Sequence, residues 1–154
     1  MAMSGHERPG FGLSIDWETP PYILTALGDF DDDPCRPDSI EGFMRPWRGR
    51  VWLNPPYNRD IGMWLEKLAD HGNGIALIFA RTETRAFQRY VWDRANALLF
   101  LSGRLKFFRD GREAKANSGA PSVLIAYGEQ NAHALGCSGL SGVLVTDWRR
   151  VGRP

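Results

Sequence analysis

The stretch "VWLNPPYNRD", residues 51–60, joins an apolar run to a rigid polar turn. Its first three residues, Val-Trp-Leu, have the β-branched and aromatic character of a buried strand. Asn54 ends the run, and Pro55 and Pro56 then remove two backbone donors and fix two φ angles. A strand therefore ends at this point, and it leaves an amide side chain, a Pro-Pro turn and Tyr57 at its carboxyl end.

Helical patterns flank this strand on both sides. A helix is predicted over 18–30, with Thr19 as its N-cap and two prolines in its first turn. A second helix is predicted over 61–72, where apolar residues share one face and Gly72 stands near the end. The segment 31–50 is rich in proline, glycine and acidic residues, which predicts a loop region.

The rest of the chain continues the alternation. "GIALIFA" (74–80) is a continuous apolar run typical of a strand buried on both faces, and helical spacing returns over 83–95. Further strands are predicted over 97–102, 104–108, 122–128 and 142–148, with a short polar helix or turn between the last two. This pattern predicts an α/β fold: a mainly parallel sheet with helices on both faces and an antiparallel hairpin at its edge. We interpret residues 17–154 as one compact Rossmann-like domain and residues 1–16 as an N-terminal arm.

The composition is that of an ordinary globular protein. The chain has 154 residues, 43% of them hydrophobic and 24% charged, and its length fits one domain. No apolar run approaches the ~20 residues that cross a bilayer, and the N-terminus lacks the apolar core of a signal peptide, so we expect no membrane association. Cys35 and Cys137 have no metal-ligand spacing with the histidines. This predicts reduced thiols, no metal site and a cytoplasmic location.

In sheets of this kind, ligand sites lie at the carboxyl ends of strands, which is where residues 54–57 fall. The Asn54 side chain and the Pro55 carbonyl offer two hydrogen-bond acceptors, the prolines hold them in place, and Tyr57 offers a flat aromatic face. Two acceptors beside a stacking surface suit an amino group on a planar ring, whose nitrogen attacks more readily when both of its hydrogens are accepted. The alternative is structural: Asn54 caps the following helix, and the prolines only shape the loop.

Other segments accompany this motif along the chain. They are Trp17-Glu18-Thr19-Pro20, Asp33-Pro34-Cys35, Trp47 just before the strand, "ARTET" (80–84), "FLSGRLKF" (100–107) and "APSVLIAYG" (120–128). Together with "VWLNPPY", these blocks resemble the phage-type, Dam-like DNA N6-adenine methyltransferases, which use S-adenosyl-L-methionine. The resemblance covers about residues 17–128 and keeps the order of the family's motifs.

The resemblance implies a role for each matched residue. Asn54, Pro55, Pro56 and Tyr57 would be catalytic and would hold and activate a flipped adenine. The cofactor would be bound by Trp17, Thr19, Pro20, Asp33 and Asn54. Larger enzymes of this chemistry have a glycine-rich turn after their first strand, whereas none follows Asp33, which leaves open how the cofactor is held. Each of two cofactor residues has a structural alternative. Trp17 could be a core aromatic residue, and Asp33 could be one of three consecutive acidic residues in a loop.

Basic residues are concentrated in the middle of the chain. Residues 1–80 contain 7 basic and 12 acidic residues, whereas residues 81–115 contain 9 basic and 4 acidic residues. The net charge of the whole chain is +1. This distribution indicates a polyanionic partner, and the alternative is a solvated charged surface. Arg81, Arg85 and Arg89 have the spacing of one helical face, and Arg104 and Lys106 alternate on a predicted strand. With Ser122 added from the family pattern, the residues expected to contact double-stranded DNA are Arg81, Thr82, Arg85, Arg104, Lys106 and Ser122.

The main hypothesis is therefore methyl transfer to adenine N6 in DNA, with the base flipped into the Asn-Pro-Pro-Tyr pocket. An RNA adenine and a protein glutamine amide are alternative acceptors, and a nucleic-acid-binding module without catalysis is the alternative from another class. The family implies a phage or prophage enzyme of DNA restriction-modification in a bacterial host, acting as a monomer or homodimer. Sequence choice is expected to come from loops 31–49 and 108–120, from the arm or from a second subunit, and 109–121 is predicted to be mobile before DNA binds.

Overall fold

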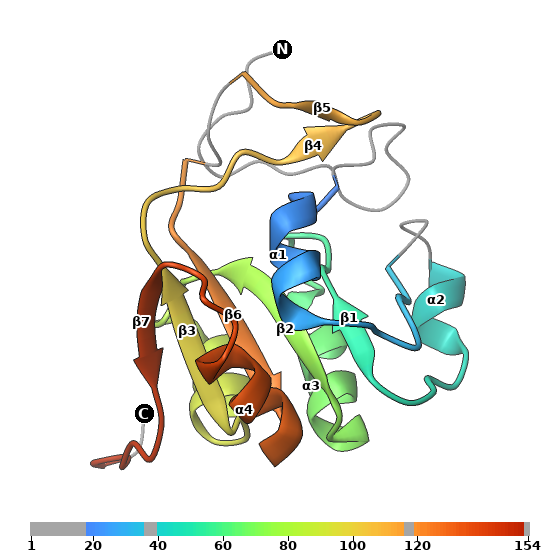
Figure 1. Cartoon of the computed structure of the whole chain (residues 1–154). Coiled ribbons are helices and arrows are strands. Elements are labelled where there is room, and N and C mark those ends of the chain that lie inside the picture. Colours follow the sequence, from blue (N-terminus) through green and yellow to red (C-terminus); the bar gives the residue numbers. More distant parts are fainter. Residues whose placement is uncertain (1–17, 36–39, 116–118, 153–154) are drawn as a thin grey trace.

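The computed structural model describes residues 18–35, 40–115 and 119–152, which form an α/β structure around a mixed sheet of five strands (Figure 1). The elements are α1 (Pro21–Leu27), α2 (Ile40–Met44), β1 (Val51–Leu53), α3 (Ile61–His71), β2 (Gly74–Phe79), the π-helix η1 (Phe87–Trp92), β3 (Ala97–Leu101), β4 (Phe108–Arg109), β5 (Arg112–Glu113), β6 (Ser122–Tyr127), α4 (Glu129–Gly136) and β7 (Gly142–Val145). The strand order is β1-β2-β6-β3-β7, and β4 and β5 form a separate hairpin.

Strand directions correct one prediction, because the sheet is not mainly parallel. Only β1 and β2 pair in parallel, whereas β6 lies between β2 and β3 and is antiparallel to both, and β7 is antiparallel to β3. Continuous apolar runs mark strands buried on both faces, and such a run is the same whichever way the strand points. The edge of the sheet is antiparallel, as predicted, but it is not a hairpin, because β7 pairs with β3 and not with β6, the strand before it in the chain. Because β1, β2 and β3 still point the same way, they end at the edge where β6 begins, and we call this edge the rim (Figure 1).

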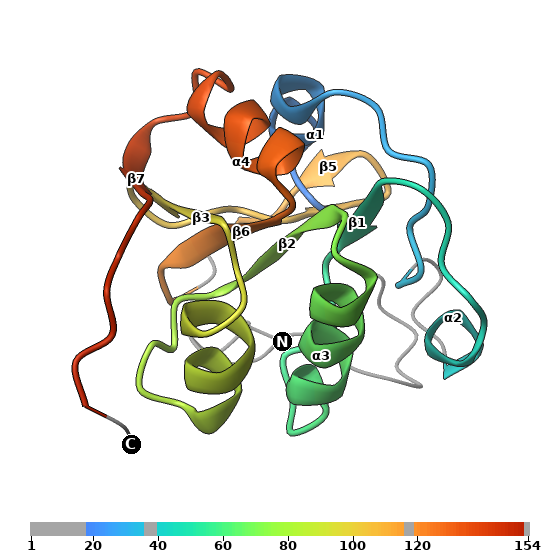
Figure 2. The ribbon, with the colours of Figure 1, turned by 90° about the horizontal axis from the view of Figure 1, so that it is seen from below.

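Helices cover both faces of the sheet (Figure 2). On one face α1 and α4 bury Ile23, Leu27 and Leu135 against alternate side chains of the central strands. On the other face α3 and η1 bury Trp64, Leu65 and Phe87 against the remaining side chains. The strand period of two, with apolar residues at every position, produces these two separate apolar layers.

Helix α3 forms as predicted, whereas α1 differs at its start. In α3 the buried residues share one face, and Gly72 ends the helix with a φ of 75° and a backbone N–H bonded to the Leu68 carbonyl. Helix α1 begins at Pro21 and follows Pro20, and no side-chain hydrogen bond caps it. The prediction of Thr19 as N-cap is therefore wrong, because the Thr19 hydroxyl is hydrogen-bonded to Asn54 instead.

Two predictions about the basic segment also need correction. Residues 87–92 form a π-helix, and Arg81 lies before it at the end of β2, so Arg81, Arg85 and Arg89 do not line one face of an α-helix. Residues 104–107 belong to no strand, although their exposure alternates as a strand pattern would: Arg104 and Lys106 are exposed, and the residues between and after them are buried.

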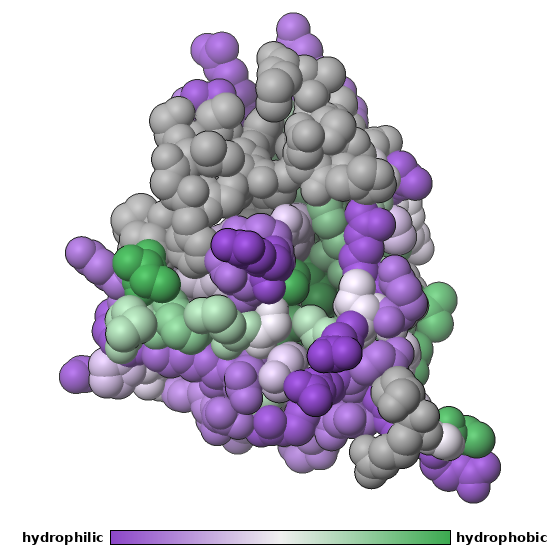
Figure 3. All heavy atoms as spheres, turned by 180° about the vertical axis from the view of Figure 1, so that it is seen from behind, coloured by the Kyte–Doolittle hydropathy of each residue, from purple (hydrophilic) through white to green (hydrophobic). Residues whose placement is uncertain are grey.

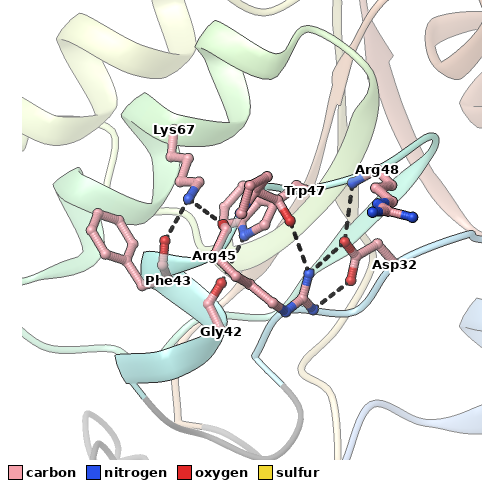
Figure 4. Close-up of polar contacts among 8 residues, drawn as sticks. Asp32, Gly42, Phe43, Arg45, Trp47, Arg48 and Lys67 are labelled. Atoms are coloured by element: carbon pink, nitrogen blue, oxygen red, sulfur yellow. Dashed lines mark hydrogen bonds and ion pairs between the residues drawn. The ribbon is translucent and has the colours of Figure 1, made fainter.

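The segment predicted as a loop over 31–50 is more ordered than expected. It contains α2, and it also runs beside β1, where Asp32 and Val51 form a parallel bridge and the Trp52 N–H donates to the Asp32 carbonyl at 2.9 Å. Both terminal guanidinium nitrogens of Arg45, Nη1 and Nη2, donate to the Asp32 carboxylate, at 2.8 and 2.6 Å, and the Arg48 N–H donates to it at 3.1 Å (Figure 4). These hydrogen bonds lower the pKa of the Asp32 carboxyl, and the bond from Arg45 has the largest effect.

Lysine 67 of α3 completes this polar cluster. The Lys67 ammonium donates to the carbonyls of Phe43 and Arg45 at the end of α2, and it lies 4.9 Å from the centre of the Trp47 ring (Figure 4). Trp47 in turn donates to the Gly42 carbonyl at 2.8 Å. Partial burial lowers the pKa of Lys67. Through these contacts α2 and the segment at Asp32 are attached to α3 and to the edge of the sheet.

Among the helices of the described residues, none has the length and apolar composition needed to cross a membrane.

Candidate active site

Asn54 lies at the rim, directly after β1, and only 7% of it is exposed. Side chains alternate along β1: Val51 and Leu53 face α3, whereas Trp52 faces α1. Asn54 therefore faces the α1 side, where its amide nitrogen donates to the Thr19 hydroxyl at 3.1 Å. Thr19 is 8% exposed, so the hydrogen bond is shielded from water. The alternative that Asn54 caps the following helix is wrong, because α3 begins at Ile61 and has Asp60 as its N-cap.

The two prolines interrupt the hydrogen-bond ladder between β1 and β2, and the Tyr57 hydroxyl replaces one of the lost hydrogen bonds. The Val51 N–H donates to the Asn73 carbonyl, so in this register position 55 would donate to the carbonyl of Leu77. Pro55 has no N–H to give. The Tyr57 hydroxyl donates to the Leu77 carbonyl at 3.2 Å in its place. The Pro-Pro-Tyr sequence thus ends the strand while keeping a buried carbonyl satisfied.

The Tyr57 ring packs on the next strand and borders a cavity. Its centre lies 4.0 Å from that of Phe79, with the two rings tilted by 38°. Beside them is a largely apolar cavity of about 280 Å³, lined by Tyr57, Asn58, Ile61, Leu65, Ile78, Phe79, Arg81, Thr84, Ala86 and Phe87. On the face that carries α3 and η1, hydrophobic residues are visible in a hollow among hydrophilic ones (Figure 3). This space of nucleobase size lies on the α3 side of the rim next to an aromatic ring, whereas Asn54 faces the α1 side and is not among the residues that line it.

Ser122 begins β6 at the same rim. It is opposite Phe79 in the antiparallel register and is 1% exposed. Because Leu124 and Ala126 belong to the layer under α1 and α4, Ser122 points to that face too, as Asn54 does. Within the described residues its hydroxyl has no hydrogen-bond partner, which is unusual for a buried polar group.

The residues predicted to bind the cofactor are brought together only in part. Thr19 and Pro20 are buried at the rim near Asn54, and Trp17 lies outside the described residues. Asp33 is half-buried and lines a hollow of about 470 Å³ beside β1. The other residues lining it are Leu24, Thr25, Gly28, Asp29, Phe30, Asp31, Asp32 and Trp52. Asn54 and Thr19 do not line this hollow, so the structure separates Asp33 from the amide.

The predicted nucleic-acid contacts lie around the rim. Arg81 and Thr82 lie just past the end of β2, after Ala80, and the Arg81 guanidinium lies 5.8 Å from the centre of the Phe79 ring. Arg85 is exposed in the first turn before η1. Arg104 and Lys106 are exposed on the segment that leaves β3, and Lys106 lies 3.8 Å from Glu113. These basic side chains are exposed, as they would be on a solvated surface, and the feature that they share is their position around the rim.

Three features of the site escaped the sequence analysis. These are the Thr19–Asn54 contact, the cavity beside Tyr57 and the β4–β5 hairpin, which occupies part of the segment predicted to be mobile. The first two depend on tertiary packing and have no local signal. The hairpin did have a local signal in the sequence, because Asp110-Gly111 between short strand-forming segments is a strong sign of a two-residue turn.

The cysteines lie apart from this site. Cys35 is buried and Cys137 is exposed, and they do not form a disulfide. The Cys137 sulfur lies 3.5 Å from His133 Nε2, but in the described part of the chain no group of three metal-ligating side chains occurs.

Comparison of the chain with protein-family models, with curated proteins and with solved structures found no match in any of the three.

Proposed function

We propose that this chain is a DNA methyltransferase with a Rossmann-like domain, which transfers a methyl group from S-adenosyl-L-methionine to N6 of adenine. The observation that carries the proposal is the buried Asn54 at the end of β1, with its amide held by Thr19 and followed by Pro-Pro-Tyr. This arrangement suits the recognition of an aromatic amino group better than it suits a structural turn, because the helix after it needs no cap from Asn54.

The chemistry follows from what Asn54 and Pro55 can accept. Since the Asn54 nitrogen donates to Thr19, the amide oxygen is the end that accepts one N6–H, and the Pro55 carbonyl accepts the other. Both bonds draw the N6 lone pair out of conjugation with the ring and favour a tetrahedral nitrogen. Held in this way by Asn54 and Pro55, N6 would be a better nucleophile toward a methyl donor, and it would release one proton to solvent after the transfer. The bound cofactor supplies the electrophilic methyl group.

The residues near the rim fit this cofactor in type. Asp33, together with Asp29 and Asp31, provides acceptors for an amino group or ribose hydroxyls in the hollow beside β1. Thr19 and Pro20 lie next to Asn54 and provide a buried wall at the place where the methyl group must be delivered. No glycine-rich turn follows Asp33, so we propose that side-chain carboxylates take a larger part in binding the cofactor than backbone amides do.

DNA as the substrate is supported by the charge and the space around the rim. Arg81, Arg104 and Lys106 lie next to the strand ends that bear the site and can contact phosphates. The cavity beside Tyr57, on the α3 side of the rim, is large enough for a purine that has left the stack, a step that costs on the order of a few kcal/mol; Asn54 is not in its lining, so a base bound there would have to reach the amide around the end of β1. Apolar walls and the Tyr57 and Phe79 rings offset part of that cost through stacking.

The test is methyl transfer from labelled S-adenosyl-L-methionine to three acceptors in parallel: unmethylated duplex DNA, unmethylated RNA and a glutamine-containing peptide. We expect incorporation into DNA alone. Incorporation only into RNA or the peptide would overturn the choice of substrate. Failure to bind the cofactor in equilibrium dialysis would overturn the proposal as a whole and favour a binding module.

A further inference from the structure

The β4–β5 hairpin presents two arginines side by side. Asp110 and Gly111 form its turn, with φ angles of 51° and 75°, the left-handed pair that a tight two-residue turn requires. Arg109 and Arg112 are directly opposite each other in the register, as are Phe108 and Glu113. Side chains that are opposite on antiparallel strands project from the same face, so the two guanidinium groups share one face of the hairpin.

This pairing works against the stability of the hairpin. Like charges directly opposite on paired strands repel each other. The ion pair between Arg109 and Asp110 is 3.9 Å long and involves an aspartate whose side chain is 91% exposed, so water screens most of its attraction. In the described part of the chain no ion pair joins Arg112 to a carboxylate. A tight turn that holds two arginines side by side, one of them in a screened ion pair with Asp110, is suited to a dianionic or polyanionic ligand.

The hairpin is fixed relative to Asn54 by hydrogen bonds near its base. The Glu18 N–H donates to the Phe108 carbonyl at 2.6 Å, and the Phe108 N–H donates to the Glu18 carbonyl at 2.9 Å. Phe107, just before β4, is 1% exposed and anchors the hairpin in the core. The next residue after Glu18 is Thr19, which bonds to Asn54. The hairpin therefore extends beyond the rim at the end of the molecule where the site lies (Figure 1).

We propose that the outer face of this hairpin binds the sugar–phosphate backbone of the duplex next to the target adenine, with Arg109 and Arg112 on phosphates. A concave surface of about 650 Å³ on the hairpin is lined by Arg109, Asp110, Arg112, Glu113, Ala114 and Lys115, so its cationic side chains outnumber its carboxylates. Guanidinium groups make paired hydrogen bonds to phosphate oxygens and are only weakly hydrated, which suits them to this contact. The inference rests on the proposed function for the identity of the substrate, but the contact itself requires no methyl transfer.

Equilibrium binding of the full chain to a short fluorescent duplex, measured by anisotropy over a range of salt concentrations, tests this inference. The double variant Arg109→Gln/Arg112→Gln is compared with the wild type, and Arg149→Gln, an exposed residue in the segment after β7, is the matched control. We expect at least tenfold weaker binding at low salt for the double variant. Its plot of log binding constant against log salt should be less steep by about 2, since each lost phosphate contact removes about one unit. The control should bind like the wild type.

Other results would overturn the inference. Wild-type affinity and salt dependence in the double variant would exclude a phosphate contact. A loss of binding on some flanking sequences and not on others would assign the arginines to base edges instead. Thermal unfolding shows whether the double variant is still folded. Because the substitutions remove a repulsion between two arginines, its unfolding midpoint should not fall below that of the wild type. If the wild type methylates DNA and the double variant binds it unchanged, the hairpin inference fails alone. If no methylation occurs but the variant binds DNA less tightly, only the proposed function fails.

Discussion

The side-chain amide of Asn54 and the hydroxyl of Thr19 meet in a buried hydrogen bond of 3.1 Å. Thr19 precedes α1, and Asn54 ends β1, so the bond joins two elements that are far apart in the sequence. In this bond the amide nitrogen is the end that faces Thr19, and in the proposed reaction the amide oxygen is the end that faces the substrate. Thr19 is thus a positioning residue for Asn54 in the proposed reaction.

The first prediction concerns this bond. Thr19→Val keeps the shape but removes the acceptor, so the buried Asn54 nitrogen loses its partner and the amide can rotate. We expect kcat for methyl transfer to fall about tenfold, the equivalent of ~1.4 kcal/mol, with little change in KM for DNA. Thr19→Ser keeps the hydroxyl and should retain most of the activity. Equal loss in both variants, or a change confined to KM, would contradict a positioning role.

A second prediction separates the two parts of Tyr57. Tyr57→Phe removes the hydroxyl that donates to the Leu77 carbonyl, so the free energy of unfolding should fall by about 1 kcal/mol. Methyl transfer should persist, because the ring stays on Phe79. Tyr57→Ala should lose both stability and activity. Urea denaturation and steady-state rates measure the two effects, and a Tyr57→Phe variant as stable as the wild type would show that the carbonyl does not depend on this bond.

Acid stability should depend on Asp32. Its folded-state pKa lies below the ordinary value of 3.8, chiefly through the bond from Arg45, so the unfolded chain takes up the proton first as pH falls. The stabilisation is therefore present above that ordinary pKa and is lost as pH falls through the lower folded-state pKa. Asp32→Asn should flatten the decline in the free energy of unfolding below about pH 4. Asp70→Asn, which removes a solvent-exposed ion pair with Arg94, is the control and should leave the profile unchanged.

Ser122 provides a test of the rim as a binding surface. Its buried hydroxyl has no partner within the described residues, so Ser122→Ala removes an unsatisfied group and should not destabilise the fold. If the hydroxyl meets the substrate, KM for DNA should rise severalfold in this variant while the thermal midpoint holds. A lower midpoint with unchanged KM would assign Ser122 to the fold alone.

The elements with strong local patterns were predictable from the sequence, and their partners were not. The period of α3, the glycine at its end and the apolar run of β2 identify these elements because each signal lies within one segment. The direction of β6 has no such signal, since a strand buried on both faces has the same apolar sequence either way. The π-helix was expected as an α-helix for a similar reason: its apolar spacing is compatible with both.

The same distinction applies to the candidate site. Asn54 and Tyr57 could be singled out because prolines after a buried strand are locally conspicuous. The role of Thr19 could not, because a threonine before two prolines is an ordinary N-cap signal, and here a tertiary contact with Asn54 takes the hydroxyl away from the helix. Predicting that exchange requires knowing that the two elements meet.

The measurement that tests the central claim most directly is the identity of the product made by the wild type and by Asn54→Ala. Each protein is incubated with S-adenosyl-L-methionine and unmethylated duplex DNA, and the DNA is digested to nucleosides for mass spectrometry. We predict N6-methyladenine from the wild type and a loss of at least a hundredfold in the variant, with cofactor binding and the unfolding midpoint retained well enough to show a folded protein. Wild-type protein that binds the cofactor but yields no N6-methyladenine, or a variant that is as active as the wild type, would contradict the role assigned to Asn54.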